Sequence, residues 1–310
     1  MNYLTDKKIY DMLIIGGGPA GAAAALYGAR AGLSVLVIEK MMLGGEITST
    51  AWFDNYPGFP DGVGGPEFGA LLEKQLANLD VPVHNGDIEK VELQGELKKV
   101  ACSNGEFEGK TVLIATGTLP NLLGVDGELE LRGRGVSYCA TCDAAFFRGK
   151  KIVVVGGGDA ALEETIFLSR FAEKIYLIHR RDKFRGCSWL QDKVQKLPMV
   201  EVLWNTTVSR IDSDRKVSSL QVIQDGNERT LEVDGIFIYT GRLPNAPFLA
   251  GIDLERDERG YIVTTDKMET SIKGVYAAGD VRQKFLRQVI TAAADGAIAA
   301  TAVSQYLYAY

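Results

Sequence analysis

The chain has 310 residues, of which 46% are hydrophobic and 24% are charged, and its formal net charge is −6 at pH 7. This length is typical of about two domains, and the apolar content is sufficient to bury sizeable cores, which excludes a disordered chain. The acidic balance argues against a protein that binds nucleic acid, and four cysteines are too few for the disulfide framework of a secreted protein.

The N-terminal residues contain no apolar core followed by a small-residue cleavage site, so we expect no signal peptide. The small-residue segment at residues 22–25 is soon interrupted by glycines and an arginine, and it is too broken to span a bilayer. We therefore expect a cytoplasmic protein without a membrane contact. In that compartment a Cys-x-x-Cys pair is more often catalytic than structural.

A strand, a turn and a helix are predicted at the start of the chain. Residues 11–15 form a short apolar run that ends at Gly16, and residues 19–30 are rich in alanine and have the composition of a helix. Residues 34–38 form a second apolar run, with Glu39 at its carboxyl end. This order, with a Gly-x-Gly-x-x-Gly motif between the first two elements, predicts a βαβ unit that binds a dinucleotide.

The residues of this motif have distinct expected roles. Gly16 makes the turn, Gly18 lets the backbone approach the pyrophosphate, and Gly21 lets the helix pack on the strand. The helix N-terminus receives the phosphate charge, and Glu39 lies where a carboxylate accepts the hydroxyls of the adenosine ribose. The predicted contacts of the first nucleotide are Gly16, Gly18, Pro19, Ala20, Gly21 and Glu39.

Residues 44–69 contain a dense run of turn-forming residues, and we expect little regular structure there. The segment also carries aromatic side chains at Trp52, Phe53, Tyr56 and Phe59. Large apolar side chains are costly to leave in water, and a loop of this length inside a compact domain is usually functional. We therefore favour a loop that wraps a ligand over a plain surface connection.

The sequence contains an internal repeat. Residues 14–18 recur as residues 154–158, and residues 113–121 recur as residues 237–245. Two nucleotide-binding units are therefore predicted. A further strand, within residues 274–280, lies beyond the second unit and ends in the same way as a ligand-binding strand, so the second unit is nested in the first.

The repeat predicts an α/β fold of two Rossmann-like three-layer nucleotide-binding domains, the second inserted in the first. We expect residues 1–117 and 246–310 to form the first domain and residues 118–245 to form the second. Ligand contacts are also expected where strands of the first domain end, at Thr116, Gly117, Gly279 and Asp280.

The second Gly-rich motif lacks the acid of the first. Glu39 follows Gly16 by 23 positions, and the same interval from Gly156 leads to His179, which opens a basic run. A carboxylate there would repel a ribose 2′-phosphate, whereas arginine matches phosphate oxygens with paired hydrogen bonds. We therefore predict NADPH rather than NADH, and a solvated basic turn is the alternative. The predicted contacts are Gly156, Gly158, Asp159, Ala160, Ala161, His179, Arg180, Arg181 and Arg185.

Cys139 and Cys142 lie between the two nucleotide motifs, with two residues between them. This spacing allows a tight disulfide, and a dithiol between two nucleotide sites predicts electron transfer. If a helix starts at Asp143, its dipole favours the Cys142 thiolate, and Asp143 is a helix N-cap, a proton donor or both. The alternatives are an inert pair and a zinc half-site. Because Cys102 and Cys187 are not at ligand spacing, we predict no metal.

Nearly the whole chain resembles the low-molecular-weight thioredoxin reductases of the two-domain pyridine nucleotide-disulfide oxidoreductase class. The motifs that carry the resemblance are Gly16-x-Gly18-x-x-Gly21, Asn55-Tyr56-Pro57-Gly58, Cys139-Ala140-Thr141-Cys142-Asp143, Gly156-x-Gly158-Asp159-Ala160-Ala161, His179-Arg180-Arg181 with Arg185, Gly279-Asp280 and Arg287-Gln288. The resemblance implies FAD in the first domain, NADPH in the inserted domain and a homodimer. Carried over by position, it adds as FAD contacts Lys40, Gly44, Gly45, Glu46, Asn55, Arg287, Gln288 and Val289.

The resemblance also implies a catalytic cycle. NADPH reduces FAD, reduced FAD reduces the disulfide of Cys139 and Cys142, and the dithiol reduces thioredoxin or a thioredoxin-like protein. Cys142 would face the flavin, Cys139 would attack the partner, and Asp143 would donate a proton. The nicotinamide and the disulfide cannot occupy one face of the flavin together. We therefore expect the inserted domain to rotate between half-reactions about residues 116–121 and 240–245.

Two positions depart from the family pattern: Glu46 stands where Gln is usual, and Ala160 where Ser is common. Other functions are possible for the same motifs. A related flavoprotein reductase, such as the alkyl hydroperoxide reductase subunit, normally has an extra N-terminal redox domain. Ferredoxin-dependent relatives lose the second Gly-rich motif, and a ferredoxin-NADP reductase lacks the Cys-x-x-Cys pair. A non-catalytic redox sensor could use the same disulfide but would not need two nucleotide sites.

Overall fold

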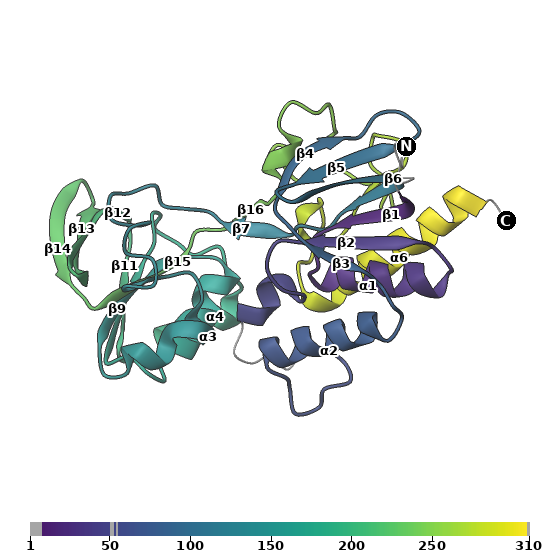
Figure 1. Ribbon diagram of the computed structural model, residues 1–310. Helices are drawn as coiled ribbons and strands as arrows, with labels where there is room; N and C mark the ends of the chain where they lie inside the picture. Colours follow the sequence, from purple (N-terminus) through teal and green to yellow (C-terminus); the bar gives the residue numbers. More distant parts are fainter. Residues whose placement is uncertain (1–7, 50–52, 54, 309–310) are drawn as a thin grey trace. The chain divides into compact units, whose positions relative to one another are not determined.

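The structure, a computed structural model, describes residues 8–49, 53 and 55–308. The chain divides into two compact units, Met1–Leu119 with Leu243–Tyr310, and Pro120–Arg242. The second unit is therefore an insertion in the first, and the chain passes twice between them (Figure 1).

The first unit is built on a seven-stranded sheet with the order β3-β2-β1-β6-β5-β4, in which β17 also pairs with β6. The pairs that join β1, β2, β3, β6 and β17 are parallel, whereas β5 pairs with β4 and β6 in antiparallel fashion. The strands are β1 (Ile9–Ile15), β2 (Val35–Glu39), β3 (Val83–Asn85), β4 (Ile88–Glu92), β5 (Lys98–Cys102), β6 (Gly105–Ile114) and β17 (Val275–Ala277).

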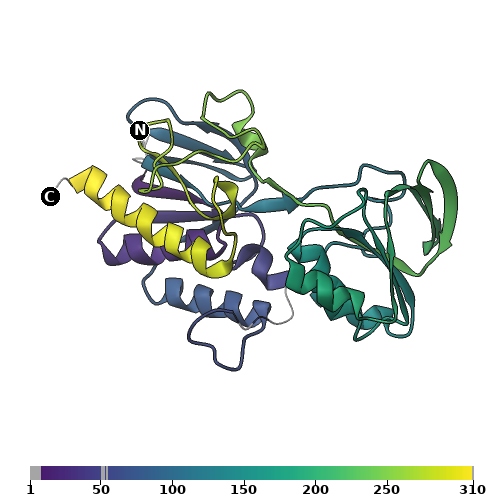
Figure 2. The same cartoon turned by 180° about the vertical axis from the view of Figure 1, so that it is seen from behind.

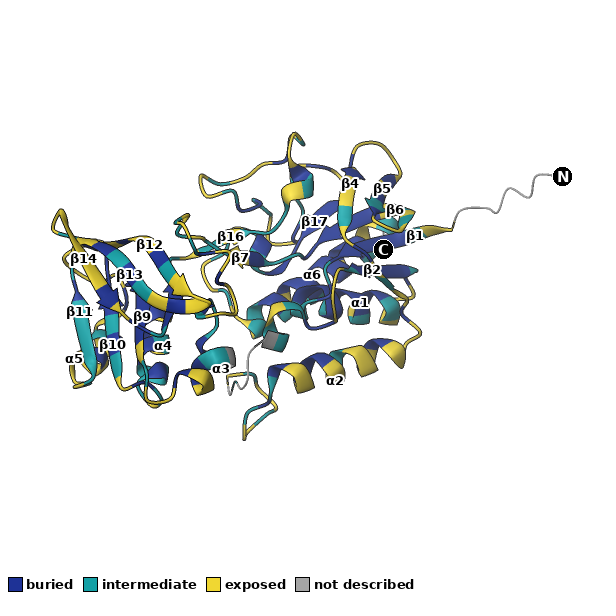
Figure 3. Ribbon diagram, turned by 60° about the vertical axis from the view of Figure 1, so that its left-hand side comes forward, coloured by how far each residue is buried: buried dark blue, intermediate teal, exposed yellow. Residues whose placement is uncertain are grey.

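The central strands of this sheet are buried (Figure 3), and the side chains of β1 alternate between its two faces. Met12 and Ile14 pack toward the helices, Leu13 and Ile15 pack toward β4 and β5, and all four are at most 1% exposed. The apolar run is thus an interior strand covered on both faces, as parallel sheets require. The helices and 3₁₀ turns are α1 (Pro19–Arg30), η1 (Gly45–Ser49), α2 (Gly65–Ala77), η3 (Pro247–Leu249), η4 (Gly279–Val281) and α6 (Val289–Tyr308).

Helices α1 and α6 lie side by side on one face of the sheet (Figures 1 and 2). Their backbones nearly touch, because a Cβ added to Gly296 would lie 2.0 Å from the carbonyl oxygen of Ala20. Only small side chains permit this approach, which explains why both helices are rich in alanine and glycine.

The expectation of little regular structure in residues 44–69 is wrong at both ends of the segment. It contains η1 near its start, and α2 begins at Gly65, preceded by Gly64 in an extended conformation and followed by Pro66 in the first turn. Proline suits this position because the first helical N–H groups lack intrahelical partners in any case. Between these elements the rings of Phe53, Tyr56 and Phe59 gather around Phe68. Trp52 lies outside the described residues.

The inserted unit has a five-stranded parallel sheet with the order β11-β10-β9-β15-β8 and a three-stranded antiparallel sheet, β12-β13-β14. Ile152 and Val154 pack toward the helices, whereas Val153 and Val155 pack toward the antiparallel sheet. The elements are β8 (Val136–Ser137), α3 (Ala140–Asp143), η2 (Ala144–Phe147), β9 (Lys151–Gly156), α4 (Asp159–Leu168), β10 (Lys174–Ile178), α5 (Ser188–Gln195), β11 (Val200–Leu203), β12 (Thr206–Asp214), β13 (Lys216–Gln224), β14 (Asn227–Glu232) and β15 (Gly235–Tyr239).

The two units repeat one arrangement. In the first unit β1 lies between β2 and β6, and the Gly-rich motif at Gly16 follows it. In the inserted unit β9 lies between β10 and β15, and the Gly-rich motif at Gly156 follows it. The predicted α/β fold with two Rossmann-like units is therefore confirmed.

The two crossing segments pair with each other as the short strands β7 (Thr118–Pro120) and β16 (Arg242–Pro244). Their hydrogen bonds are reciprocal: the N–H of Asn121 donates to the carbonyl of Gly241 at 2.9 Å, and the N–H of Asn245 donates to Gly117 at 2.9 Å. The repeat in the sequence thus corresponds to a local pseudo-two-fold pairing.

Candidate functional site

The first Gly-rich motif joins β1 to α1 and leaves the helix N-terminus open. Gly16 has φ +102°, and a Cβ there would lie 2.6 Å from the carbonyl oxygen of Ala115. Gly18 precedes α1 without any side-chain cap, and a Cβ added to it would meet no atom nearer than 3.9 Å. A Cβ on Gly21 would lie 1.8 Å from the oxygen of Gly16. Space and uncapped N–H groups therefore remain in front of α1, as an anion-binding helix start requires.

Glu39 ends β2 beside this motif, and its carboxylate is fixed by backbone donors. Oε2 accepts a hydrogen bond from the N–H of Gly17 at 2.6 Å, and Oε1 accepts one from the N–H of Met41 at 3.0 Å. An ionised carboxylate has about four acceptor positions, so it can still accept hydroxyl groups. Lys40, by contrast, points its ammonium group to the Asp87 carboxylate at 2.7 Å on the surface.

Residues distant in the sequence meet around this loop. The N–H of Gly44 donates to the carbonyl of Gly17 at 2.9 Å, and a Cβ on Gly45 would lie 3.0 Å from the Cα of Gly18. Glu46 follows as an exposed residue in the first turn of η1. The predicted contact Asn55 is joined to another, Gln288, because its Nδ2 donates to the Gln288 Oε1 at 3.2 Å.

The carboxyl ends of β6 and β17 carry the other predicted residues of the first unit. Thr116 follows β6, and its buried hydroxyl has no hydrogen-bond partner within the described chain. Gly117 has φ +66°. Asp280 lies in η4, the third residue after β17. Its carbonyl accepts a 3.4 Å hydrogen bond from Nε of Arg287, whose guanidinium stacks 3.9 Å from the Tyr261 ring centroid. Val289 is the first residue of α6.

The second Gly-rich motif is equally open. Gly158 precedes α4 in an extended conformation without a side-chain cap, and a Cβ added to it would meet no atom within 4 Å. A Cβ on Gly156 would lie 2.7 Å from the carbonyl oxygen of Tyr239, so this position requires glycine. Asp159 begins α4, and its Oδ1 accepts a hydrogen bond from the N–H of Cys187 at 2.7 Å. Ala160 is exposed and Ala161 is buried.

The basic segment after β10 is attached to this motif. The N–H groups of Arg185 and Gly186 donate to the carbonyl of Gly157 at 2.7 and 3.1 Å. The side chains of Arg180, Arg181 and Arg185 are exposed. Three guanidinium groups therefore lie on a segment that touches the nucleotide loop, with their charges available to a ligand.

His179 differs from the arginines that follow it, because its side chain is only 5% exposed. A Cβ added to Gly157 would lie 2.3 Å from the His179 Nδ1, so the ring lies directly beneath the Gly-rich loop, near Phe184 and Trp204. Burial, followed by the charge of Arg185, lowers the pKa of His179 below its usual value. The imidazole is therefore neutral at pH 7 and supports the loop from inside.

Cys139 is disulfide-bonded, whereas Cys102 and Cys187 are free. Cys139 immediately precedes α3, and its backbone is held by Ser137, whose hydroxyl accepts from the Cys139 N–H at 3.1 Å and lies 3.2 Å from the Cys139 carbonyl. The side chain of Cys142 lies outside the described residues. Its pairing with Cys139 therefore remains a prediction from the sequence.

The expected helix start at Asp143 is wrong. Helix α3 begins at Ala140, so Cys142 lies within the helix and Cys139 occupies the position before it. Cys142 is the third residue of this four-residue helix, so it lies inside the first turn and not directly before a helix, as the dipole argument had assumed. Asp143 occupies the N-cap position of η2 but makes no side-chain cap hydrogen bond, so the expected N-cap is confirmed in position only.

Tyr239 is a functional candidate that the sequence analysis missed. Its backbone pairs with Gly156 at the end of β15, and its hydroxyl accepts a hydrogen bond from the N–H of Ala140 at 2.7 Å. It thus connects the nucleotide motif to the first residue of α3. The internal repeat contained a signal for it, because Tyr239 occupies the position that Ala115 occupies in the first unit.

A second missed group, Glu164, lies on α4. Burial and the neighbouring Glu163 carboxylate raise the pKa of Glu164 to about 7. Burial, followed by the Glu164 charge, raises the pKa of Tyr239 well above its usual range. Glu164 therefore changes its charge near neutral pH in the electrostatic field of the tyrosine that binds α3.

Across the described ranges, no helix is long and apolar enough to cross a membrane. No group of three or more His, Cys, Asp and Glu side chains in the same part of the chain is arranged to hold a metal ion.

Comparison with known proteins identifies close relatives. A family model described as pyridine nucleotide-disulphide oxidoreductase matches residues 10–296. The thioredoxin reductase of Bacillus subtilis (strain 168) is 44% identical over 98% of this chain and 96% of its own. The crystal structure of Lactococcus lactis thioredoxin reductase is 40% identical, with a TM-score of 0.88 over 96% of this chain and 99% of that one. The T. acidophilum thioredoxin reductase structure is 32% identical, with a TM-score of 0.85 over 97% and 99%.

Proposed function

This chain belongs to the pyridine nucleotide-disulphide oxidoreductase family, and on that premise we propose that it is an NADPH-dependent thioredoxin-disulfide reductase that uses FAD. The observation that carries the proposal lies in the inserted unit. There the disulfide-bonded Cys139 and the open loop at Gly158 are connected through Tyr239. The net reaction transfers two electrons from NADPH to a thioredoxin disulfide and takes up one proton.

The first unit, which we propose to comprise residues 1–117 and 246–310, has features that fit FAD. The open start of α1 suits the pyrophosphate, the backbone-fixed carboxylate of Glu39 suits the ribose hydroxyls, and the unpartnered hydroxyl of Thr116 needs a polar group. FAD supplies the two-electron relay between a hydride donor and a disulfide. The further proposed contacts are Gly16, Gly18, Pro19, Ala20, Gly21, Lys40, Gly44, Gly45, Glu46, Asn55, Gly117, Gly279, Asp280, Arg287, Gln288 and Val289.

In the second unit, proposed as residues 118–245, Gly156, Gly158 and the start of α4 receive the NADPH pyrophosphate. Arg180, Arg181 and Arg185 bind the 2′-phosphate, since all three are exposed on a segment attached to the Gly-rich loop. The burial of His179 favours a supporting role for its ring. Asp159, Ala160 and Ala161 complete the loop.

For the dithiol we propose that Cys142 faces the flavin, that Cys139 attacks the thioredoxin disulfide, and that Asp143 donates the proton. The position of Cys139 directly before α3, with its N–H bonded to the Ser137 hydroxyl, supports its role as the attacking residue, because its backbone is fixed there. The exposed aromatic ring of Phe146 in η2, which is 72% exposed, gives a partner protein an apolar contact beside the disulfide.

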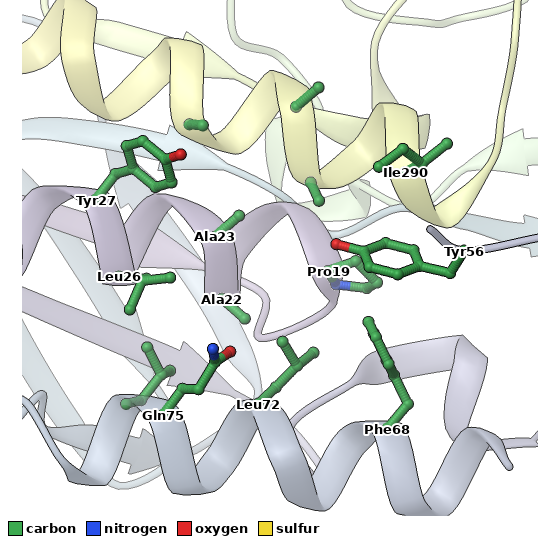
Figure 4. A pocket seen from close by; sticks show the side chains of 14 residues that line it. Pro19, Ala22, Ala23, Leu26, Tyr27, Tyr56, Phe68, Leu72, Gln75 and Ile290 are labelled. Atoms are coloured by element: carbon green, nitrogen blue, oxygen red, sulfur yellow. The ribbon is translucent and has the colours of Figure 1, made fainter. Parts of the chain in front are cut away.

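We also propose a cytoplasmic homodimer without membrane or nucleic-acid partners. A groove of about 310 Å³ runs between α1, α2 and α6 and is lined largely by apolar side chains (Figure 4). Tyr27 and Ile290 at this groove are 50% and 39% exposed, and Ile298 nearby is 42% exposed. An apolar surface of this kind is typical of an interface, here with a second copy.

The proposed cycle requires the nicotinamide and the dithiol to reach one flavin in turn. The passage of the chain between the units at residues 116–121 and 240–245 supports a hinge there, because a few residues at element ends can absorb such a rotation.

The test is an NADPH oxidation assay with thioredoxin disulfide as acceptor. We expect the purified protein to be yellow and to oxidise NADPH at a rate that depends on thioredoxin concentration. Flavin reduction without turnover of any protein disulfide would instead favour a redox sensor. Turnover with a peroxidase disulfide but not with thioredoxin would favour an alkyl hydroperoxide reductase type.

A further inference from the structure

Asp295 is a buried carboxylate in α6 that the proposed cycle does not use. Its residue is 7% exposed, and it accepts hydrogen bonds from the N–H of Gly279 at 3.0 Å and from Nζ of Lys284 at 2.7 Å. Both of its oxygens lie 3.4 Å from Nη1 of Arg282. The side chains of Lys284 and Arg282 are themselves only 7% and 13% exposed.

These contacts organise the segment that carries Asp280. The bond to Gly279 fixes the first residue of η4, and the ion pair with Arg282 fixes the residue that follows it. Arg287 then donates to the carbonyls of Asp280 and Arg282 at 3.4 Å each. The Asp295 carboxylate therefore holds the segment of residues 279–287 at several points. This segment contains the proposed FAD contacts Gly279, Asp280 and Arg287.

The cluster of Asp295, Arg282 and Lys284 adjoins the start of α1. A Cβ on Gly279 would lie 2.9 Å from the Cβ of Ala20, which is in the first turn of α1. Gly296, the neighbour of Asp295, approaches the same residue, as described above. The Asp295 carboxylate is thus bonded to Gly279, which contacts the helix start that the pyrophosphate of FAD would face.

Two largely buried cations, Arg282 and Lys284, share the carboxylate of Asp295. A buried cation is costly unless an anion lies nearby. The diphosphate of FAD is an anion of the required sign. The carboxylate in turn keeps the two cations from repelling each other.

We propose that Asp295 is a positioning residue for the flavin nucleotide: it fixes Gly279 against the start of α1 and holds Arg282 and Lys284, so that Asp280 and the two cations are in place before FAD binds. This inference rests on the proposed use of FAD. It assigns to α6 a role in cofactor affinity, in addition to its role in the core.

The test compares Asp295→Asn with Asp11→Asn. Asp11 is a matched control, because it is also 7% exposed in the first unit and accepts from Nζ of Lys110 at 2.7 Å, but it lies in β1 on the side away from Gly16. Both substitutions remove the charge of a buried carboxylate that pairs with a lysine, although the Lys110 side chain is 47% exposed, and both should lower the melting temperature of the apoprotein. FAD binding to each apoprotein is measured by the quenching of flavin fluorescence.

We expect the Kd for FAD to rise about 10- to 100-fold for Asp295→Asn and less than threefold for Asp11→Asn, since charged hydrogen bonds are the stronger class. An unchanged Kd for Asp295→Asn, or an equal rise for both variants, would overturn the inference. If Asp295→Asn does not fold, Lys284→Met takes its place in the comparison with Asp11→Asn. A Kd for FAD equal in these two variants would then overturn the inference. Failure of the wild-type apoprotein to bind FAD would refute the proposed function instead.

Discussion

The nucleotide preference offers the sharpest test of the second site, through the double substitution Arg180→Ala with Arg181→Ala. Both side chains are exposed, and the segment is tied to the Gly-rich loop by the backbone of Arg185. The substitution should therefore remove charge without releasing the segment. A charge-assisted hydrogen bond contributes about 1.5 to 3 kcal/mol, and solvent exposure favours the lower end of that range.

Two such contacts give about 3 kcal/mol, which corresponds to a loss of about 150-fold in kcat/KM for NADPH. NADH has no 2′-phosphate, so its kcat/KM should change by less than about threefold. The assay is steady-state oxidation of each nucleotide with thioredoxin in excess. A control with equal charge loss is Lys216→Ala with Arg229→Ala, two exposed cations of the antiparallel sheet.

A parallel loss for NADPH and NADH would refute this reasoning, because it would show that the basic segment only supports the loop. An unchanged kcat/KM for NADPH would show that the 2′-phosphate binds outside the basic segment. A higher salt concentration should reduce the difference in kcat/KM for NADPH between the wild type and the double variant, because salt screens exposed charges.

Three further outcomes are expected. Cys142→Ser should still accept hydride from NADPH into the flavin but fail to reduce thioredoxin, with both steps measured by stopped-flow absorbance. An equal loss of flavin reduction and thioredoxin reduction would contradict the proposed path of electrons from flavin to disulfide. Phe146→Ala should raise the KM for thioredoxin about tenfold and leave flavin reduction unchanged, and a change in both would argue against a docking role. Because the pKa of Glu164 is raised from 4.5 to about 7, its contribution to stability is full below pH 4.5 and is lost as the pH rises to about 7. Glu164→Gln should therefore raise the free energy of unfolding at pH 8 by up to about 3 kcal/mol, and with it the melting temperature, but should change neither at pH 4. A melting-temperature shift of the same size at both pH values would refute this.

The features that the sequence predicted well are those encoded locally. The first apolar run, Gly16 and the following alanine-rich helix occupy consecutive positions, and each preference agrees with its neighbours. The repeat then doubled this information, since Gly156 occupies the position in the second unit that Gly16 occupies in the first. The α/β fold could therefore be predicted from a single chain.

The features that it missed depend on contacts between distant segments. Helix α3 begins at Ala140 because its N–H donates to Tyr239, which is 99 residues further along the chain. His179 stands at a position that suggested phosphate binding, but Gly157 leaves room for its ring beneath the loop. Asp295 lies in a helix whose small residues indicate only a packed core. None of these partners could be chosen from periodicity or spacing.

The contacts of Tyr239 bear on how the proposed cycle operates. Its backbone is fixed to Gly156 in the central sheet, and its hydroxyl holds the first residue of α3, so the disulfide and the NADPH loop are parts of one frame. Local movement of α3 would break the bond between Ala140 and Tyr239 and leave a buried donor without a partner, which costs about 1 to 3 kcal/mol. Pivoting about the paired crossing segments preserves every contact inside the inserted unit. We therefore expect nicotinamide and disulfide to exchange at the flavin by rotation of the inserted unit as a whole, and not by unfolding of its redox helix.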